Sequence, residues 1–279
     1  MKGGKNLAAL YLYCLRENSE DSPIPSTKSI DGEREVFALP FRELEAVVSE
    51  VSLEEFGCEE VQKRAQEDLS WIKEKALTHA RVIQEAMGED HIGLSLIPMR
   101  FGTIFKERAG LEEVLEKDYF KIREILERIR GKQEWSVKVY LRDRKAFEEK
   151  TKEKNEAIKE KEIEISSLPE GIAYFMEETL KEIISKEVDK ELNFIVAHIY
   201  EKFKKHAVDS VRCKILGREL MGRIEPMVLN AAYLLREEKI EDFKKEIEEL
   251  NEMIPGQGLY IEYSGPWPAY NFTGYENYD

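Results

Sequence analysis

The residues best suited to chemistry in this 279-residue chain are one arginine on a predicted strand and a polar turn far from it in sequence. Arg100 stands between Met99 and Phe101 in the segment PMRFGTIF. A guanidinium between apolar side chains can hold a carboxylate or carbonyl groups of its own fold, or the anion of a ligand. The polar turn adds Arg218, Glu219, Arg223 and Glu225. These residues predict, as the strongest enzyme-like arrangement in the chain, a small-ligand pocket around Arg100.

Motifs that mark common catalytic and metal sites do not occur in the sequence. It has no phosphate-binding loop, no GxGxxG after a predicted strand, and no HExxH, CxxC or GxSxG. The three cysteines, Cys14, Cys58 and Cys213, are too far apart to form a paired zinc site or a disulfide framework, which favours a reducing cytoplasm. His79 is predicted to be a buried histidine bonded to backbone. We therefore expect no catalytic residue, no cofactor and no metal.

The charge of the chain excludes one class of partner. Its 57 acidic and 43 basic residues give a net charge of −14. Such a surface repels phosphate backbones, so we expect no nucleic-acid partner. The apolar runs are shorter than the roughly 20 residues that cross a bilayer, so we expect no lipid-membrane partner. The N-terminal apolar run lacks a cleavage site and is predicted to be a strand.

A second group of candidate residues lies near the C-terminus, in the segment GLYIEYSGPWPAYNF at 258–272. Its first half alternates as a half-buried strand, and Gly265-Pro266-Trp267-Pro268 is predicted to end that strand. The two prolines restrict the backbone, which predicts a stiff, extended tail. This tail presents three aromatic residues: Trp267, Tyr270 and Phe272. It either packs on its own protein or binds a partner.

The first half of the chain predicts a sheet with helices. An apolar run at 7–15 indicates a central strand, and two short runs indicate a hairpin around Phe41-Arg42-Glu43. A helix is predicted over 59–87 and another over 111–129. Between them, residues 94–105 are predicted to form a strand with Pro98 at an edge or a bulge, because proline cannot donate to a ladder.

The second half predicts a strand, a long helix, two strands, a helix and a closing strand. A charged segment at 145–164 precedes the long helix and is predicted to be a solvated helix or a mobile arm. The remaining predicted elements cover 135–141, 171–203, 211–216, 227–235 and 238–254. This order is that of the ferredoxin-like split βαβ arrangement, an antiparallel sheet with two helices on one face.

The predicted fold class is therefore α+β, with two domains that each contain an antiparallel sheet covered by helices. The N-terminal α+β domain is predicted to span 1–132. The ferredoxin-like domain with the long helix is predicted to span 133–264 and to include the charged arm at 145–166. The C-terminal tail covers 265–279.

Four passages give the chain a resemblance to the gas vesicle protein L/F family. They are PMRFGTIF at 98–105, WSVKVY at 135–140, LNAAYL at 229–234 and GPWPAYNF at 265–272. The segment GIAY at 171–174 is similar to a helix start of that family. Ala269 stands where the family usually has proline, and the charged insertion at 148–166 is a further departure.

This resemblance implies an accessory or minor structural protein of gas vesicle formation, without catalysis, in the cytoplasm and associated with gas vesicles. The implied partners are the small shell subunit, gas vesicle protein A, and other gas vesicle accessory proteins. We expect the protein to hold the shell subunit at nucleation, through an apolar groove or by strand addition at the edge broken by Pro98. The candidate partner-binding residues are Pro98, Arg100, Phe101, Trp267, Tyr270 and Phe272.

Two other functions are compatible with the residues. One is a small-ligand-binding or enzymatic ferredoxin-like protein with a pocket around Arg100. The other is a helical scaffold that forms oligomers through the apolar stripe of 170–204.

Overall fold

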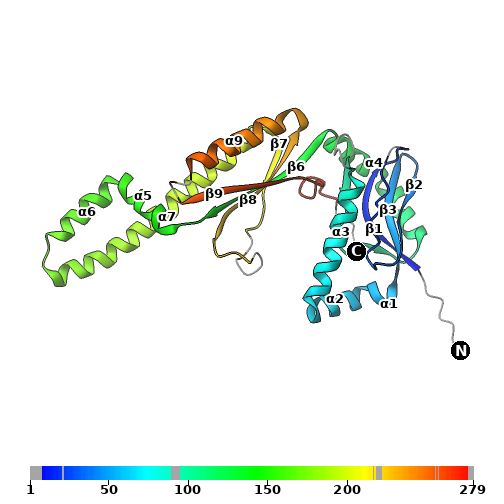
Figure 1. The fold of residues 1–279 in the computed structure, drawn as a ribbon, viewed down its shortest axis with the longest axis horizontal. Helices are drawn as coiled ribbons and strands as arrows, with labels where there is room; N and C mark the ends of the chain where they lie inside the picture. The colour runs from blue at the N-terminus through cyan, green and yellow to red at the C-terminus, as the bar shows by residue number, and fades with distance from the viewer. Residues whose placement is uncertain are drawn as a thin grey trace. The chain divides into compact units, whose positions relative to one another are not determined.

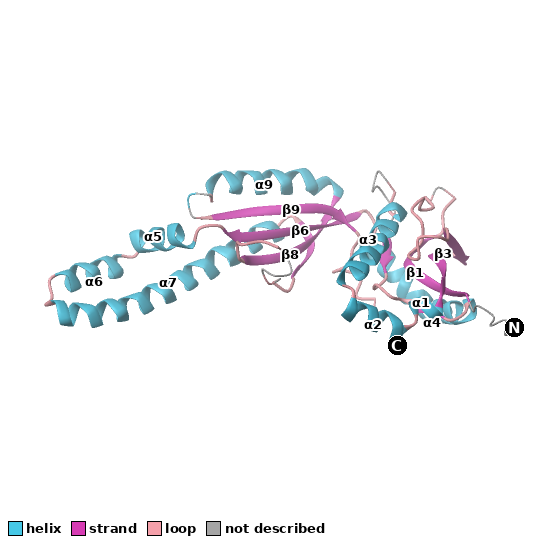
Figure 2. Ribbon diagram, turned by 60° about the horizontal axis from the view of Figure 1, so that its bottom comes forward, coloured by secondary structure: helices cyan, strands magenta, loops and turns pink. Residues whose placement is uncertain are grey.

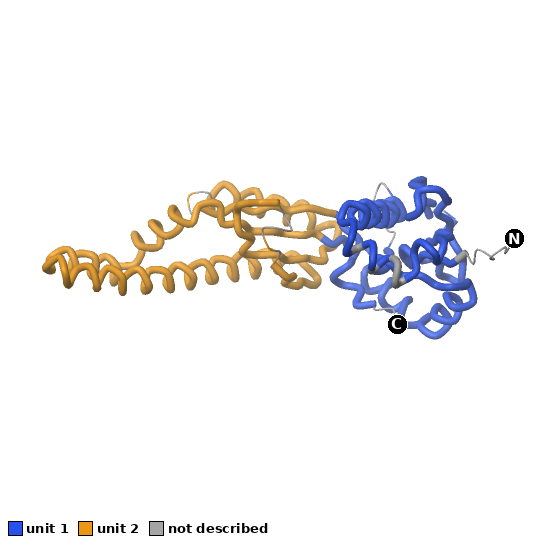
Figure 3. The backbone as a smooth tube through the Cα atoms, turned by 90° about the horizontal axis from the view of Figure 1, so that it is seen from below, with its two compact units in different colours: residues 1–134, 266–279 blue, residues 135–265 orange. Residues whose placement is uncertain are grey.

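The computed structural model describes residues 8–20, 22–88, 95–215, 217, 222–254, 256 and 258–275. Contacts divide the chain into two compact units, which are coloured separately in Figure 3. Unit 1 comprises residues 1–134 and 266–279, and unit 2 comprises residues 135–265. Each unit contains helices and a sheet with antiparallel pairing. The predicted mixed fold with two antiparallel sheets is therefore confirmed.

The sheet of unit 1 has the strand order β2-β3-β1-β4, and β5 also pairs with β1. Its strands are β1 (Ala8–Glu17), β2 (Val36–Phe41), β3 (Leu44–Ser52), β4 (Leu96–Pro98) and β5 (Ile104–Phe105). As predicted, β1 is a central strand: every residue from Ala9 to Leu15 is buried. The predicted hairpin is also present, with Arg42 at its turn in the left-handed region at φ 54°.

The helix predicted over 59–87 is two helices, α2 (Cys58–Glu67) and α3 (Leu69–Ala86), which follow the single turn of α1 (Leu53–Phe56). The break is at Asp68, whose backbone is extended and whose carboxylate accepts hydrogen bonds from the N–H groups of Ser70 and Trp71. This is an N-cap, which starts a new helix.

The break also moves the buried face of α3. The predicted apolar stripe contained Leu69, which is 75% exposed. Ile83 of the predicted stripe is buried, and the other residues that α3 buries are Lys75, His79, Val82 and Ala86. The predicted stripe assumes one uninterrupted helix. Because a new helix starts after Asp68, the residues of α3 face other directions than in that single helix. Helix α4 (Arg108–Ile129) forms as predicted and lies on the other side of the sheet from α3 (Figure 1).

The sheet of unit 2 has the strand order β7-β8-β6-β9. Its strands are β6 (Lys132–Leu141), β7 (Ala207–Arg212), β8 (Met227–Arg236) and β9 (Leu259–Trp267). Strand β7 lies four residues earlier than the prediction of 211–216, because it pairs with β8 from Leu235 to Ala231 and ends with that pairing. Leu216, the last residue of the predicted strand, lies outside the described residues.

One face of this sheet carries the core of unit 2. Alternate residues of β6, such as Val137 and Val139, share a buried cluster with Ile199 of α7 (Glu170–Lys204) and Phe243 of α9 (Ile240–Met253). Because residues two apart in a strand point the same way, both helices cover the same face. Helix α9 follows a short turn, η1 (Glu237–Lys239), and buries the inward residues that its periodicity predicts.

The charged segment before α7 forms two helices, α5 (Arg144–Lys154) and α6 (Glu156–Ser166). Figures 1 and 2 show α7 continuing past the sheet, with α5 and α6 running back along it. The charged composition of this segment predicted a solvated helix or a mobile arm with almost no apolar face. The absence of an apolar face is wrong. A narrow buried stripe faces α7: Phe147, Thr151, Ile158 and Ile165. Spacings of four and seven residues keep these four on one side of the helices.

None of the described helices is long and apolar enough to cross a membrane. Within the same described residues, no cluster of three or more histidine, cysteine or acidic side chains is placed to hold a metal ion. Cys14 and Cys213 are not joined in disulfides.

Candidate functional site

A groove of about 460 Å³ in unit 1 brings together four of the six residues that the sequence singles out. These four are Pro98, Arg100, Phe101 and Tyr270. Helix α3, the turn after β4 and the C-terminal segment form its walls. Its other lining residues are Ala76, His79, Ala80, Met99, Thr273, Gly274 and Tyr275.

His79 lies at the floor of this groove in a fixed hydrogen-bond network. Its Nε2 is 3.1 Å from the carbonyl oxygen of Met99, which can only accept, so Nε2 carries the proton. Its Nδ1, 3.0 Å from the hydroxyl of Tyr11, therefore accepts from that hydroxyl. Burial lowers the pKa of His79 to about 4, so the ring is neutral at neutral pH. The prediction of a structural histidine bonded to backbone is confirmed.

Arg100 lies at the rim, in a tight turn between β4 and β5. Its carbonyl accepts from the N–H of Thr103 at 3.2 Å and from the hydroxyl of Thr103 at 2.8 Å. Gly102 adopts φ 86°, and its N–H donates to the Tyr11 hydroxyl at 3.0 Å. The continuous strand predicted over 94–105 is therefore wrong, because this turn separates two short strands. Pro98 does lie on an edge strand, as predicted, and it is buried.

The C-terminal segment forms one wall of the groove and is not the extended tail that the two prolines predict. Strand β9 runs on through Pro266 to Trp267, and the chain then turns. The N–H of Tyr270 donates to the carbonyl of Pro268 at 2.6 Å, and the N–H of Phe272 donates to the carbonyl of Ala269 at 3.1 Å. Proline is tolerated in β9 because β9 is an edge strand.

Three side chains from the rest of unit 1 hold this segment. Arg128 donates to the carbonyl oxygens of Phe272 at 2.7 Å and of Thr273 at 3.2 Å. Glu134 accepts from the backbone and side-chain N–H groups of Asn271 at 2.9 and 2.6 Å. The hydroxyl of Tyr275 donates to Asp118 at 3.0 Å. The segment is therefore packed on its own protein.

The three tail aromatics differ in burial. Phe272 is buried, whereas Trp267 and Tyr270 are 40% and 43% exposed. Trp267 is therefore not a fully buried core residue. Of the two alternatives for the tail, packing on its own protein accounts for Phe272. The exposed surface of Trp267 and Tyr270 leaves them accessible to a partner.

Glu134 is the carboxylate that holds the segment, and it is almost fully buried. Burial raises its pKa to about 7, against the opposing effect of its two hydrogen bonds from Asn271. The sequence does not reveal this contact, because Glu134 and Asn271 are 137 residues apart and no local pattern pairs them.

The polar turn that was grouped with Arg100 belongs to unit 2. Arg223 forms an ion pair with Glu262 at 2.7 Å and donates to the Tyr260 hydroxyl at 3.2 Å. Its guanidinium also lies over the ring of Tyr140. The charge of Arg223 is thus satisfied within its own unit. Arg218 and Glu219 lie outside the described residues.

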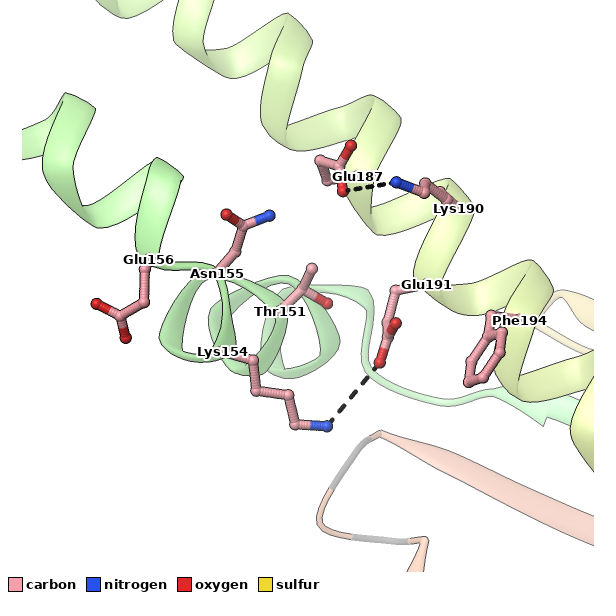
Figure 4. A pocket seen from close by; sticks show the side chains of 8 residues that line it. All are labelled: Thr151, Lys154, Asn155, Glu156, Glu187, Lys190, Glu191 and Phe194. Carbon is pink, nitrogen blue, oxygen red and sulfur yellow. Dashed lines mark ion pairs between the residues drawn. The ribbon is translucent and has the colours of Figure 1, made fainter.

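A second groove, of about 480 Å³, lies in unit 2 where the junction of α5 and α6 meets α7 (Figure 4). Lys190 pairs with Glu187 at 3.5 Å, and Lys154 approaches Glu191 at 3.9 Å. The other lining residues are Thr151, Asn155, Glu156 and Phe194. Because its lysines pair with glutamates of the same groove, we interpret it as a seam between packed helices.

A profile described as gas vesicle synthesis protein GvpL/GvpF matches residues 9–274 of this chain. The chain belongs to the GvpL/GvpF family. This confirms the resemblance carried by the four sequence passages. It also gives the chain a role related to gas vesicles.

Individual relatives agree with this assignment. The chain is 26% identical over 213 residues to gas vesicle protein L of Streptomyces sp. strain CB03234, covering 75% of this chain and 72% of that protein. It is 23% identical over 264 residues to gas vesicle protein F of Haloferax mediterranei, covering 95% and 92%.

Two crystal structures share the fold. Gas vesicle protein GvpF of Anabaena sp. PCC7120 matches with a TM-score of 0.71 and 20% identity, over 97% of this chain and 100% of that chain. GvpF of Microcystis aeruginosa matches with a TM-score of 0.63 and 18% identity, over 96% and 99%.

Proposed function

We propose that this GvpL/GvpF family member binds the small shell subunit, gas vesicle protein A, and limits its aggregation during nucleation of the vesicle. The observation that carries the proposal is the groove of unit 1, which gathers Pro98, Arg100, Phe101 and Tyr270. A shell subunit that faces gas must be apolar on one side, so it needs cover before assembly. The net charge of −14 would keep such a complex soluble.

The groove is a better docking site than the edge of β4. That strand has only three residues, and Pro98 removes one of its donors. Strand addition needs a longer row of open backbone groups. The groove instead offers exposed side chains, including Arg100 and Tyr270. Tyrosine and arginine are frequent hot-spot residues at protein interfaces, so we assign the docking to these side chains.

The proposal extends to the setting and the domain organisation. The protein acts in the cytoplasm at the growing vesicle, together with other accessory proteins of the vesicle and without catalysis. Unit 2 is a ferredoxin-like module, supported by its strand order β7-β8-β6-β9. We propose the domains 1–132 and 133–264 around the two sheets, with Tyr270, Thr273, Gly274 and Tyr275 of the C-terminal tail at 265–279 completing the docking groove.

The test fills the groove without disturbing the core. Ala80 lines the groove on an exposed face of α3, whereas Leu77 is 57% exposed on the same helix and does not line the groove. Each is replaced by arginine, and the tagged chain is co-expressed with the shell subunit. We expect Ala80→Arg to retain about tenfold less soluble shell subunit than wild type, and Leu77→Arg to retain the wild-type amount.

Equal retention by the two variants would show that the shell subunit docks elsewhere on the chain. No retention by wild type would remove the shell-binding proposal itself. Far-ultraviolet circular dichroism of both variants serves as the folding control.

A second candidate function rests on the volume of the same groove. About 460 Å³ lies within the range of small-molecule sites, and the Arg100 side chain would suit an anionic ligand. A rise in melting temperature with a set of small carboxylates or phosphates, lost in Arg100→Ala, would favour this ligand-binding function. No rise, together with binding of the shell subunit, would exclude it.

A further inference from the structure

The end of the hairpin formed by α6 and α7 exposes a group of apolar side chains. Ile172, Tyr174 and Phe175, in the first two turns of α7, are between 55% and 75% exposed. Ile163 of α6 is 71% exposed. The rings of Tyr174 and Phe175 contact each other edge to face, 6.0 Å between centroids. We call the three α7 residues, Ile172, Tyr174 and Phe175, the hairpin patch. Figures 1 and 2 show that this end of the hairpin extends away from the sheet of unit 2.

The hairpin patch does not contribute to the core of its own unit. The buried residues at this end of the hairpin are Ile165 and Leu180, which line the opposite, inner side between the two helices. Exposed aromatic residues gathered at one place on a soluble surface are typical of an interaction site. Tyrosine and phenylalanine supply much of the contact energy in such sites.

Acidic residues surround the hairpin patch. Residues 160–182 contain seven glutamates and two lysines, a net charge of −5. Glu170 and Glu178 lie one helical turn before and after Tyr174. Of these seven glutamates, Glu178 forms an ion pair with Lys181 at 2.7 Å. The other six form no ion pair with any residue that the structure describes. The local negative charge is therefore largely uncompensated.

We propose that the hairpin patch binds a short amphipathic segment of another protein that combines apolar residues with lysine or arginine. The apolar side chains would cover Tyr174 and Phe175, and the basic residues would neutralise the surrounding glutamates. A second copy of this chain is a poor occupant, because two patches of net charge −5 would repel each other. An anionic lipid surface is disfavoured for the same reason. This surface is separate from the groove of unit 1.

The experiment measures binding of two fluorescent probe peptides to the purified full chain by anisotropy. One probe is an 18-residue amphipathic peptide of leucine and lysine, and the other has glutamate in place of every lysine. The patch variant is Tyr174→Ser with Phe175→Ser. Its control is Phe120→Ser, because Phe120 is 82% exposed on α4 of unit 1. We expect the patch variant to bind the basic peptide at least about tenfold more weakly than wild type, and the control to bind like wild type.

Charge is tested separately. Glu170→Gln, Glu177→Gln and Glu178→Gln are combined, and the control neutralises the exposed residues Glu113, Glu124 and Glu252. We expect the first set to weaken binding and to reduce its salt dependence more than the second set. Both sets reduce the net negative charge of the chain by the same amount. Equal losses in the two sets would overturn the proposal, because binding would then follow total charge alone.

Three other results would also overturn it: equal binding of the acidic peptide, wild-type binding by the patch variant, or equal weakening by Phe120→Ser. Thermal unfolding checks the fold of each variant. Because Tyr174 and Phe175 are exposed, their replacement is expected to leave the melting temperature of the chain unchanged.

Discussion

At the scale of single residues, two buried groups of unit 1 contribute to its pH dependence in opposite directions. The pKa of Glu134 is raised to about 7, so the folded chain binds a proton there between pH 4.5 and 7 that the unfolded chain does not. The pKa of His79 is lowered to about 4, so the unfolded chain binds the extra proton between pH 4 and 6.5. Glu134 thus favours folding at low pH, and His79 favours folding at neutral pH.

We predict that Glu134→Gln changes the slope of stability against pH. Wild type loses the Glu134 contribution as pH rises through 7, and the glutamine variant has no such loss. At about 1.4 kcal/mol per pKa unit, the difference in unfolding free energy between variant and wild type should shift by roughly 3 kcal/mol in favour of the variant from pH 4.5 to 8. Urea unfolding at both pH values measures this shift.

His79 is present in both proteins, so its contribution cancels in the comparison. Superimposed stability profiles of wild type and variant would mean that Glu134 titrates normally and that its burial is unimportant. A variant with unchanged pH dependence but lower stability at every pH would assign Glu134 a purely steric role.

At the scale of elements, the edge of β9 is closed by a side chain of a helix. The N–H of Ile261 donates to Oδ1 of Asn251, and Nδ2 of Asn251 donates to the carbonyl of Ile261, both at 2.8 Å. Asn251 belongs to α9, and β9 lies at the edge of its sheet. The amide thus occupies the two backbone groups that a neighbouring strand would use.

We predict that Asn251→Ala lowers the free energy of unfolding by about 1–3 kcal/mol, because two backbone groups of Ile261 lose their partner. The neighbouring replacement Glu252→Ala, at an exposed position of the same helix, should change stability by less than about 0.5 kcal/mol. Chemical denaturation of both variants gives the comparison. Equal effects would show that the amide contributes no more than a surface residue.

Periodicity predicted those elements whose pattern is uninterrupted. Three expected patterns appear: the buried stripe of α4, the alternation of buried and less buried residues along β6, and the burial of both faces of β1. It failed where one side chain changes the backbone. Asp68 divides a helix by capping its N–H groups, and Gly102 divides a strand by its left-handed turn. These interruptions depend on local hydrogen bonds that hydrophobic patterning does not register.

The groove shows a different limit of sequence reasoning. Its residues on the strand and in the tail stood out as proline, arginine and aromatic residues in rigid segments. The α3 wall of Ala76 and Ala80 did not, because its position depends on the phase set by Asp68. The contacts that hold the tail join residues more than 130 positions apart, which no local pattern specifies.

At the scale of the whole molecule, the core of unit 2 is one hydrophobic cluster that extends from the sheet into the hairpin. Ile158, Ile165, Leu180 and Ile184 are buried in the part of the hairpin formed by α6 and the first half of α7. The sheet is covered instead by the second half of α7, through Ile199 and Phe203, and by α9.

We therefore predict that replacing residues 157–186 by a short glycine-serine linker leaves a folded protein. Its melting temperature should fall by no more than roughly 5 °C, and its unfolding should remain cooperative. Differential scanning calorimetry measures both. Loss of the cooperative transition would show that the hairpin is required for the sheet core to form. If the fold is retained, the shortened chain should also lose binding of the basic probe peptide.

The placement of the last residues in unit 1 has a consequence for synthesis. Residues 135–265 leave the ribosome before Asn271, Phe272 and Tyr275, which pack against Glu134, Arg128 and Asp118. Unit 1, whose first 134 residues are translated first, is thus completed last, whereas unit 2 is contiguous and complete earlier. On a nascent chain, the groove lacks its C-terminal wall until Tyr270 to Tyr275 have been translated. Under the proposed function, a shell subunit would meet a complete groove only after these residues have been translated.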